Sequence, residues 1–263
     1  MRSAGSNGEV TEKAIRQVAV QVFAKHGFQA ASLRLIAKEV GIQAPSLYNY
    51  IDSKEQLLFE LLREPVTQMM AEYKADAATA LDPFARLRLF IRVHLDFHLD
   101  YRMEVFIGNM ELRNLTKQHY KTVTGLRDQY SNLLTSIIED GVAQGVFKVE
   151  EPRVTTFAVL AMLSGVCNWY RPDGGLSKGR IMEIHTRLAL EMLGLGPDRV
   201  EQGVASEPPV STAARPAAAA KLAAPVARKA AARKAVAQKV VAGKAAPKKA
   251  AAARSKAAKP QPA

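Results

Sequence analysis

The sequence predicts an all-α protein, and three observations support that class. Apolar residues recur at helical spacing (i, i+3, i+4, i+7) through most of residues 11–193. No segment shows the strict alternation of a half-buried strand, and no convincing hairpin occurs. Glycines, prolines and capping residues stand where the periodic segments begin and end. The chain also lacks an internal repeat of roughly 20–50 residues, which argues against a repeat architecture.

Three helices separated by short turns are predicted at the N-terminal end. Residues 1–9 are small and polar, and we expect them to be a flexible arm. A helix at 12–26 carries its apolar residues on one face and ends before a glycine. Ser32 is expected to cap a second helix that closes at Gly41, and a third helix starts after a three-residue turn with Pro45 in its first turn. Two short helices joined by a glycine turn form a helix-turn-helix.

Further helices are predicted as far as residue 193. Asp52 or Ser53 caps the first of them, and Pro65 predicts a kink or a break within it. The helix that follows Pro152 is apolar on most sides, so we expect it to be buried or to lie in an interface. The predicted ranges after the first are 82–101, 103–110, 114–143, 153–170 and 178–193.

Two regions of the chain differ sharply in composition. The whole chain has 263 residues, 48% of them hydrophobic, which suffices for one sizeable domain or two small ones. Residues 208–263 hold 13 of the 37 basic residues and no acidic residue, which leaves 24 basic and 25 acidic residues in 1–207. This cationic segment is mostly Ala, Lys, Arg and Pro, and it buries too little apolar surface to offset its ordering entropy. We therefore expect residues 197–263 to be a disordered basic tail.

The composition also excludes several classes of protein. A single cysteine, Cys167, rules out an intrachain disulfide framework and a Cys-rich zinc module. The absence of disulfides is typical of proteins of the reducing cytosol. We find neither a signal peptide nor an apolar stretch of roughly 18 residues, so a cytoplasmic protein without membrane contact is expected. No phosphate-binding glycine loop, no Gly-x-Ser-x-Gly elbow and no Cys-His signature around Cys167 indicates catalysis. We predict that the protein is not an enzyme.

Residues 11–62 resemble the DNA-binding domain of the TetR family of transcriptional regulators. The resemblance rests on the segments IRQVAVQVFAKHGF (15–28), SLRLIA (32–37), GIQAPSLYNY (41–50) and DSKEQL (52–57). It implies that the helix after the turn enters the major groove of double-stranded operator DNA, a groove about 12 Å wide. A protein of this kind would be associated with the nucleoid.

The resemblance also implies a set of DNA contacts. The residues expected to face the bases are Gln43, Ala44, Ser46 and Asn49. Tyr48 and Lys54 match positions at which the family touches phosphates, and Arg34 matches a further groove or backbone contact. Base contacts carry the sequence information, whereas phosphate contacts fix the orientation. Ala44 stands where many members of the family have lysine, so the operator sequence does not carry over from them.

The C-terminal half resembles a subgroup of the same family that represses fatty-acid and sterol-ring degradation. The matching segments are GVF (145–147) and CNWYRPDGGLS (167–177). Those repressors bind acyl-coenzyme A thioesters, which implies such an effector here; the alternative is another apolar or aromatic ligand. The residues expected at the effector site are Phe90, Phe97, Tyr101, Phe106, Met110, Tyr130, Trp169 and Arg171, although aromatic residues at helical spacing are also ordinary core.

His94 and His98 stand at i, i+4 on a predicted helix, a spacing that suits a metal ion. Acidic residues lie near them in the sequence, but no third ligand is fixed by the spacing. We therefore predict no metal site and no cofactor, and we interpret both histidines as side chains near the pocket.

The sequence thus predicts a homodimeric, one-component regulator, in this family most often a repressor, that a small effector releases from DNA. The domains are expected at 10–55 for the helix-turn-helix domain and 56–196 for effector binding and dimerisation, with the dimer interface on the last two helices. Effector and DNA favour different spacings of the two DNA-binding heads, so each weakens the binding of the other by the same factor.

The basic tail resembles the linker-histone-like Lys/Ala/Pro tails of some bacterial DNA-binding proteins. Such a tail adds phosphate contacts that are blind to sequence and weaken steeply with salt. Two alternatives remain open from the sequence: a solubilising tail or one for another polyanion, and a nucleoid-type architectural protein in which the tail dominates DNA binding.

Overall fold

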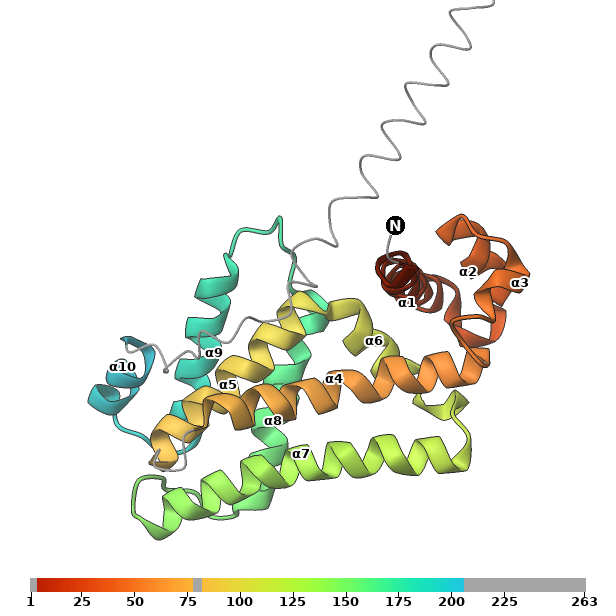
Figure 1. The fold of residues 1–263 in the computed structure, drawn as a ribbon. Coiled ribbons are helices and arrows are strands. Elements are labelled where there is room, and N and C mark those ends of the chain that lie inside the picture. Colours follow the sequence, from red (N-terminus) through yellow and green to blue (C-terminus); the bar gives the residue numbers. More distant parts are fainter. Residues whose placement is uncertain (1–3, 78–81, 206–263) are drawn as a thin grey trace, which may run out of the picture. The chain divides into compact units, whose positions relative to one another are not determined.

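The computed structural model describes residues 4–77 and 82–205, and within these ranges all regular structure is helical (Figure 1). The all-α prediction is therefore confirmed. The predicted disordered tail falls outside the described ranges from residue 206 onward. The elements in chain order are α1 (Ala4–Ala30), α2 (Leu33–Val40), α3 (Ala44–Leu47), α4 (Lys54–Asp76), α5 (Pro83–Asp100), α6 (Arg102–Met110), the 3-10 turn η1 (Leu112–Asn114), α7 (Lys117–Ala143), α8 (Pro152–Trp169), α9 (Lys178–Met192) and α10 (Pro197–Ala205).

Local capping defines the predicted helix-turn-helix. The Ser32 hydroxyl accepts a hydrogen bond from the Leu35 N–H at 3.1 Å and so caps α2. Gly41 takes a left-handed conformation (φ 86°) and ends α2, because its N–H bonds back to the Ala37 carbonyl at 2.9 Å. Pro45 lies in the first turn of α3, where a missing N–H costs nothing.

The N-terminal helices have their own hydrophobic core, which we call the head core. Its fully buried members include Ile15 of α1, Ile36 of α2, Leu47 of α3 and Leu57 of α4. Two further residues come from distant segments of the chain: Ile107 of α6 and Val123 of α7. The head is therefore packed directly against α6 and α7.

The remaining helices form a bundle around a second core. The helix α5 packs against α4, α7, α8 and α9, and its inward residues are almost wholly buried. The long helix α4 belongs to both cores, because Leu57 and Leu58 lie in the head core while Val66, Met69 and Tyr73 lie in the bundle core.

The helix α4 does not break at Pro65, one of the two outcomes predicted there, but runs on to Asp76. Buried residues on both sides of the proline hold the helix in place, and packing of this kind outweighs one missing backbone hydrogen bond.

The structure differs from the sequence prediction at both ends of the described chain. The helix α1 begins at Ala4, so most of the expected flexible arm is helical; once a helix is nucleated, adding a turn costs little. Gly27 interrupts regular helical geometry (φ 74°), close to the predicted end at residue 26.

The helix α10 occupies the start of the segment predicted as disordered tail. Val200 is 2% exposed and Gly203 is buried, because α10 packs on α9. Glu201 accepts a hydrogen bond from Arg187 of α9 at 2.6 Å. This helix forms because Pro197 suits the first helical position and one short face of the segment is apolar. The change in composition after Pro197 had instead predicted disorder.

Among the helices of residues 4–77 and 82–205, none combines the length and the apolar character that a membrane span requires.

Candidate DNA interface and effector cavity

One face of the helix-turn-helix is exposed, and the other packs into the head core. Arg34, Gln43, Tyr48 and Asn49 are exposed, with Tyr48 at 60%, whereas Ala44 and Ser46 are half-buried. Leu47, by contrast, is fully buried in the head core. The residues of the turn and α3 that are expected to contact DNA therefore lie on the outward face or at its edge. Lys54 lies at the start of α4 and is half-buried.

Lys54 has a role that the sequence did not predict. Its Nζ donates hydrogen bonds to the carbonyls of Phe28 at 2.8 Å and Ala31 at 2.9 Å, and it lies 4.3 Å from the centroid of the Phe28 ring. An ammonium group has three N–H donors, and these two short bonds together with a longer one of 3.5 Å to the Gln29 carbonyl direct all three to the backbone at the end of α1. Lys54 thus ties the first turn of α4 to the end of α1.

A basic residue that sequence reasoning missed lies one turn after Arg34. Lys38 is exposed on α2, and neither Lys38 nor Arg34 has a carboxylate partner in the ranges that the structure describes. Their i, i+4 spacing was the available indication. Together they place two positive charges one turn apart on α2, which suits contact with phosphates.

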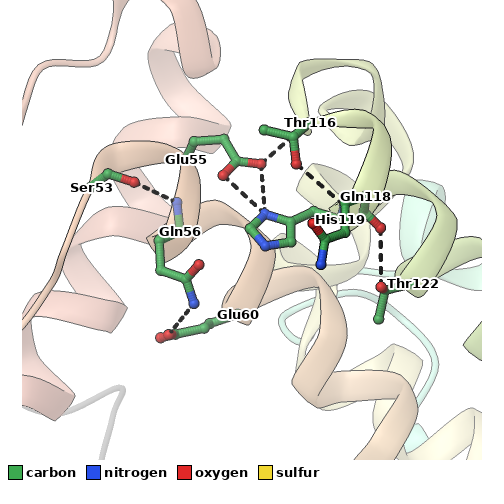
Figure 2. A network of polar contacts seen from close by, with 8 residues as sticks. All are labelled: Ser53, Glu55, Gln56, Glu60, Thr116, Gln118, His119 and Thr122. Atoms are coloured by element: carbon green, nitrogen blue, oxygen red, sulfur yellow. Dashed lines mark hydrogen bonds and ion pairs between the residues drawn. The ribbon is translucent and has the colours of Figure 1, made fainter.

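A polar joint connects the head to the bundle (Figure 2). Glu55, in the first turn of α4, accepts hydrogen bonds from the Thr116 N–H at 2.9 Å and from Nδ1 of His119 at 2.9 Å. The His119 ring also stacks on Phe59, with 3.8 Å between centroids. The start of α7 is therefore fixed to the start of α4.

A second joint connects the end of α1 to η1. The side-chain amide of Gln29 donates to Oδ1 of Asn114 at 2.6 Å, and the Asn114 amide donates to Glu111 at 2.6 Å. Because η1 directly follows α6, these bonds connect the C-terminal end of α6 to the end of α1.

A cavity of about 220 Å³ lies within the bundle. That is the volume of roughly seven molecules of liquid water and less than the ~300 Å³ at which sites for drug-sized ligands begin. It therefore suits a short acyl chain, a ring, or one part of a larger ligand. Its lining residues are Leu62, Pro65, Val66, Met69, His94, Phe97, His98, Glu104, Val105, Gly108, Asn109, Arg127, Tyr130, Leu160 and Ser164.

Two stacked histidines form the polar floor of the cavity. The His94 and His98 rings are 3.8 Å apart, and Nδ1 of His98 bonds to the His94 carbonyl at 2.9 Å. The two ring nitrogens of His94 face the Tyr130 hydroxyl at 3.2 Å and the Ser164 hydroxyl at 3.1 Å. Burial lowers the pKa of His94 well below its usual value and that of His98 to about 4, so both are neutral at neutral pH.

An arginine and a glutamate also line the cavity. Arg127 of α7 donates from Nη2 to the Gly108 carbonyl of α6 at 2.8 Å; burial lowers its pKa, yet a guanidinium remains charged at neutral pH. Burial also raises the pKa of Glu104. Neither was predicted as an effector contact, although Arg127 stands three residues before Tyr130 on the inward side of α7.

The predicted effector residues fall into three groups. Phe97 and Tyr130 line the cavity. Two others lie behind that lining: Phe90 is fully buried with its ring 4.7 Å from that of Tyr130, and the ring of Tyr101 stacks on Phe97 at 4.7 Å. The remaining four are exposed and are not part of the lining: Phe106, Met110, Trp169 and Arg171.

Helix geometry explains why two residues of α6 point away from the cavity. With about 100° between successive residues, Glu104, Val105 and Gly108 share one face, whereas Phe106 and Met110 fall on the opposite face. Trp169 instead stacks on His185 of α9, with 5.8 Å between centroids. The sequence marked these residues as aromatic or apolar but did not fix which face the bundle encloses.

The structure offers no metal site within the described ranges, where no three His, Cys, Asp or Glu side chains gather. The pair His94 and His98 is committed to protein hydrogen bonds instead. Partial burial raises the pKa of the Cys167 thiol, which donates to the Ser164 carbonyl at 3.1 Å, so the thiol is not activated as a nucleophile.

Comparison with known proteins agrees with this architecture. Residues 15–61 match the family described as bacterial regulatory proteins of the tetR family, and residues 80–193 match the tetracyclin repressor-like C-terminal domain. The chain belongs to the TetR family of DNA-binding transcriptional regulators. Its relatives are regulators and not enzymes.

Individual relatives show the same extent of similarity. The transcriptional repressor KstR2 of Rhodococcus jostii is 26% identical over 193 residues, which cover 73% of this chain and 94% of KstR2. The fatty acid metabolism regulator protein of Bacillus subtilis is 25% identical over 134 residues, covering 51% of this chain and 69% of that protein. The similarity to KstR2 thus spans nearly the whole length of that repressor.

Solved structures share the fold. A tetR-family regulatory protein from Rhodococcus RHA1 superposes with a TM-score of 0.65 at 25% identity, covering 71% of this chain and 98% of that one. AibR, solved with isovaleryl coenzyme A and operator DNA, gives a TM-score of 0.60 at 24% identity, covering 70% and 97%.

Proposed function

We propose that this protein is a dimeric repressor that a small acyl effector releases from its operator, with an acyl-coenzyme A thioester as the favoured ligand. The naming of one relative for fatty acid metabolism and the isovaleryl coenzyme A in the AibR structure support this ligand class. At about 220 Å³ the cavity takes only the acyl end of such a molecule, so the coenzyme would extend outside it.

One observation carries the proposal: the cavity and the DNA-binding head share two helices. The helix α4 contributes Leu62, Val66 and Met69 to the cavity wall and Leu57 to the head core. The helix α6 contributes Gly108 to the wall, and the adjacent Ile107 is fully buried in the head core. A ligand that changes the spacing of α4 and α6 therefore changes the position of the head, which couples effector binding to DNA binding.

We propose that α8 and α9 form the dimer interface, as expected from the sequence. Both helices leave apolar side chains exposed, and exposed apolar surface on neighbouring helices is typical of an interaction site. The exposed residues are Val154, Phe157, Ala158 and Ala161 of α8 and Leu188 and Met192 of α9. The domain limits that fit this arrangement are 10–55 for the head and 56–196 for the bundle, with α4 spanning the boundary.

The basic segment 208–263 fits the same function as a second, sequence-blind contact with DNA. Its 13 basic residues, without an acidic one, are tethered to a specific head, which raises their effective concentration at the operator.

Selection of bound sequences from a random DNA pool by the full chain tests the proposal. We expect one enriched, two-fold symmetric site, and we expect hexanoyl-coenzyme A, but not free coenzyme A, to lower the affinity for that site. The variant Tyr48→Phe, which loses one exposed hydroxyl, should weaken binding to DNA and leave ligand binding unchanged. Failure to enrich any sequence would contradict the repressor function, and an affinity unchanged by the thioester would contradict the effector class.

A further inference from the structure

We infer that Arg127 binds the acyl oxygen of the effector, whether a thioester carbonyl or a free carboxylate, and that this contact transmits the signal to α6. The inference rests on the proposed effector function and names the chemical group that the cavity recognises.

Arg127 is a largely buried cation with spare hydrogen-bonding capacity. Within residues 4–77 and 82–205 it has no carboxylate within salt-bridge distance, and its hydrogen bond is the one to the Gly108 carbonyl at 2.8 Å. A guanidinium has five N–H donors, so most of them remain available on a side chain that lines the cavity. A buried charge of this kind gains most from an anionic or carbonyl oxygen, which it binds in a fixed geometry.

The two histidines and Glu104 do not replace Arg127 in this role. His94 and His98 are neutral, and both ring nitrogens of His94 are already engaged by hydroxyl groups. When it is ionised, Glu104 repels a carboxylate and accepts hydrogen bonds rather than donating them. Among the described residues that line the cavity, Arg127 is thus the only cation at neutral pH, and it sets where the ligand oxygen lies.

The apolar lining sets where the rest of the ligand lies. Val66 and Met69 of α4 and Leu160 of α8 are apolar cavity residues, suited to a short alkyl chain. Asn109 lines the cavity and is exposed, so the cavity reaches the surface at the end of α6. The coenzyme portion of a thioester would leave through that opening.

The bond between Arg127 and Gly108 is placed to transmit the signal. A Cβ atom at position 108 would lie 3.2 Å from Nη2 of Arg127, so glycine gives the guanidinium room to approach α6. The preceding residue, Ile107, is buried in the head core. A ligand oxygen that draws Arg127 away from the Gly108 carbonyl therefore loosens α6 one residue from the head.

Calorimetric titration of the full chain tests the inference with hexanoyl-coenzyme A, sodium hexanoate, free coenzyme A and 1-hexanol. The test variant is Arg127→Gln, and Arg127→Lys retains the charge if the first variant folds poorly. The matched control is Arg102→Gln, because Arg102 also donates to a backbone carbonyl, that of Tyr170 at 2.6 Å, but does not line the cavity. We expect Arg127→Gln to weaken binding of the acyl probes about tenfold or more and to leave binding of 1-hexanol unchanged. The control variant Arg102→Gln should bind the probes as the wild type does.

Each outcome decides a separate point. Loss of hexanoate binding identifies a carboxylate as the recognised group, and loss of hexanoyl-coenzyme A binding alone identifies the thioester carbonyl. Equal affinity of wild type and Arg127→Gln, or equal weakening in Arg102→Gln, overturns the inference and leaves the proposed function standing. If neither acyl probe binds the wild type, the proposed effector class fails and the inference fails with it.

Hydrogen exchange then tests the signal. Amides at 107–115 should exchange faster in the wild type with bound acyl probe than without it, and this difference should vanish in Arg127→Gln. Unchanged exchange in the liganded wild type overturns the transmission step.

Discussion

Lowering the pH should destabilise this protein through its buried histidine pair. Burial depresses the pKa of folded His98 to about 4, whereas an unfolded histidine titrates near 6.5. Above the unfolded value neither state binds a proton, so stability does not depend on this group. As the pH falls below about 6.5 the unfolded chain takes up the proton first, and stability is lost progressively until the pH reaches the folded value.

The size of the effect follows from the two pKa values. At about pH 5 the unfolded His98 is almost fully protonated and the folded one is mostly neutral, which corresponds to a loss of about 2 kcal/mol relative to pH 7. His94, whose pKa burial also lowers, contributes in the same direction. For a domain of marginal stability this is a substantial fraction of the total.

Urea unfolding at pH 7 and pH 5, at one fixed protein concentration, measures the effect. In His98→Gln the drop in unfolding free energy between the two pH values should be about 2 kcal/mol smaller than in the wild type. Glu104, whose pKa burial raises, contributes with the opposite sign, but it is present in both proteins and cancels in the difference. His26→Gln, at an exposed position of α1, should leave the drop unchanged. An equal drop in wild type and His98→Gln would refute the argument.

Three further predictions concern the head, the dimer and the tail. Lys54→Met keeps the apolar stem but removes two charged hydrogen bonds to carbonyls, so urea unfolding should show a loss of about 2 kcal/mol, and an unchanged midpoint would contradict this role. Phe157→Glu should convert the dimer to a monomer in sedimentation experiments without a change in helical content, and a persistent dimer would exclude this face. Deletion of 208–263 should retain sequence-selective DNA binding but flatten its salt dependence, by about 0.9 in log–log slope for each phosphate that the tail had neutralised; an unchanged slope would show that the tail does not bind DNA.

The sequence by itself determined the helices and the helix-turn-helix, because local interactions specify both. The Ser32 cap, the left-handed Gly41 and the proline at the start of α3 each act within four residues of chain. The same local information placed the exposed residues Gln43, Tyr48 and Asn49 on the face opposite the buried Leu47. Of the eight residues expected at the effector site, Phe97 and Tyr130 line the cavity.

Only the tertiary structure decided the roles of Lys54 and Arg127. Lys54 meets carbonyls more than twenty positions earlier in the chain, and Arg127 meets a carbonyl nineteen positions away, so neither partner is encoded in local spacing. The cavity draws on five helices, from α4 to α8, and a period of 3.6 residues shows that a helix has an apolar face without showing what that face encloses. For the same reason Phe106 was predicted at the effector site although it is exposed, and α10, which buries Val200 and Gly203 against the bundle, was assigned to the tail.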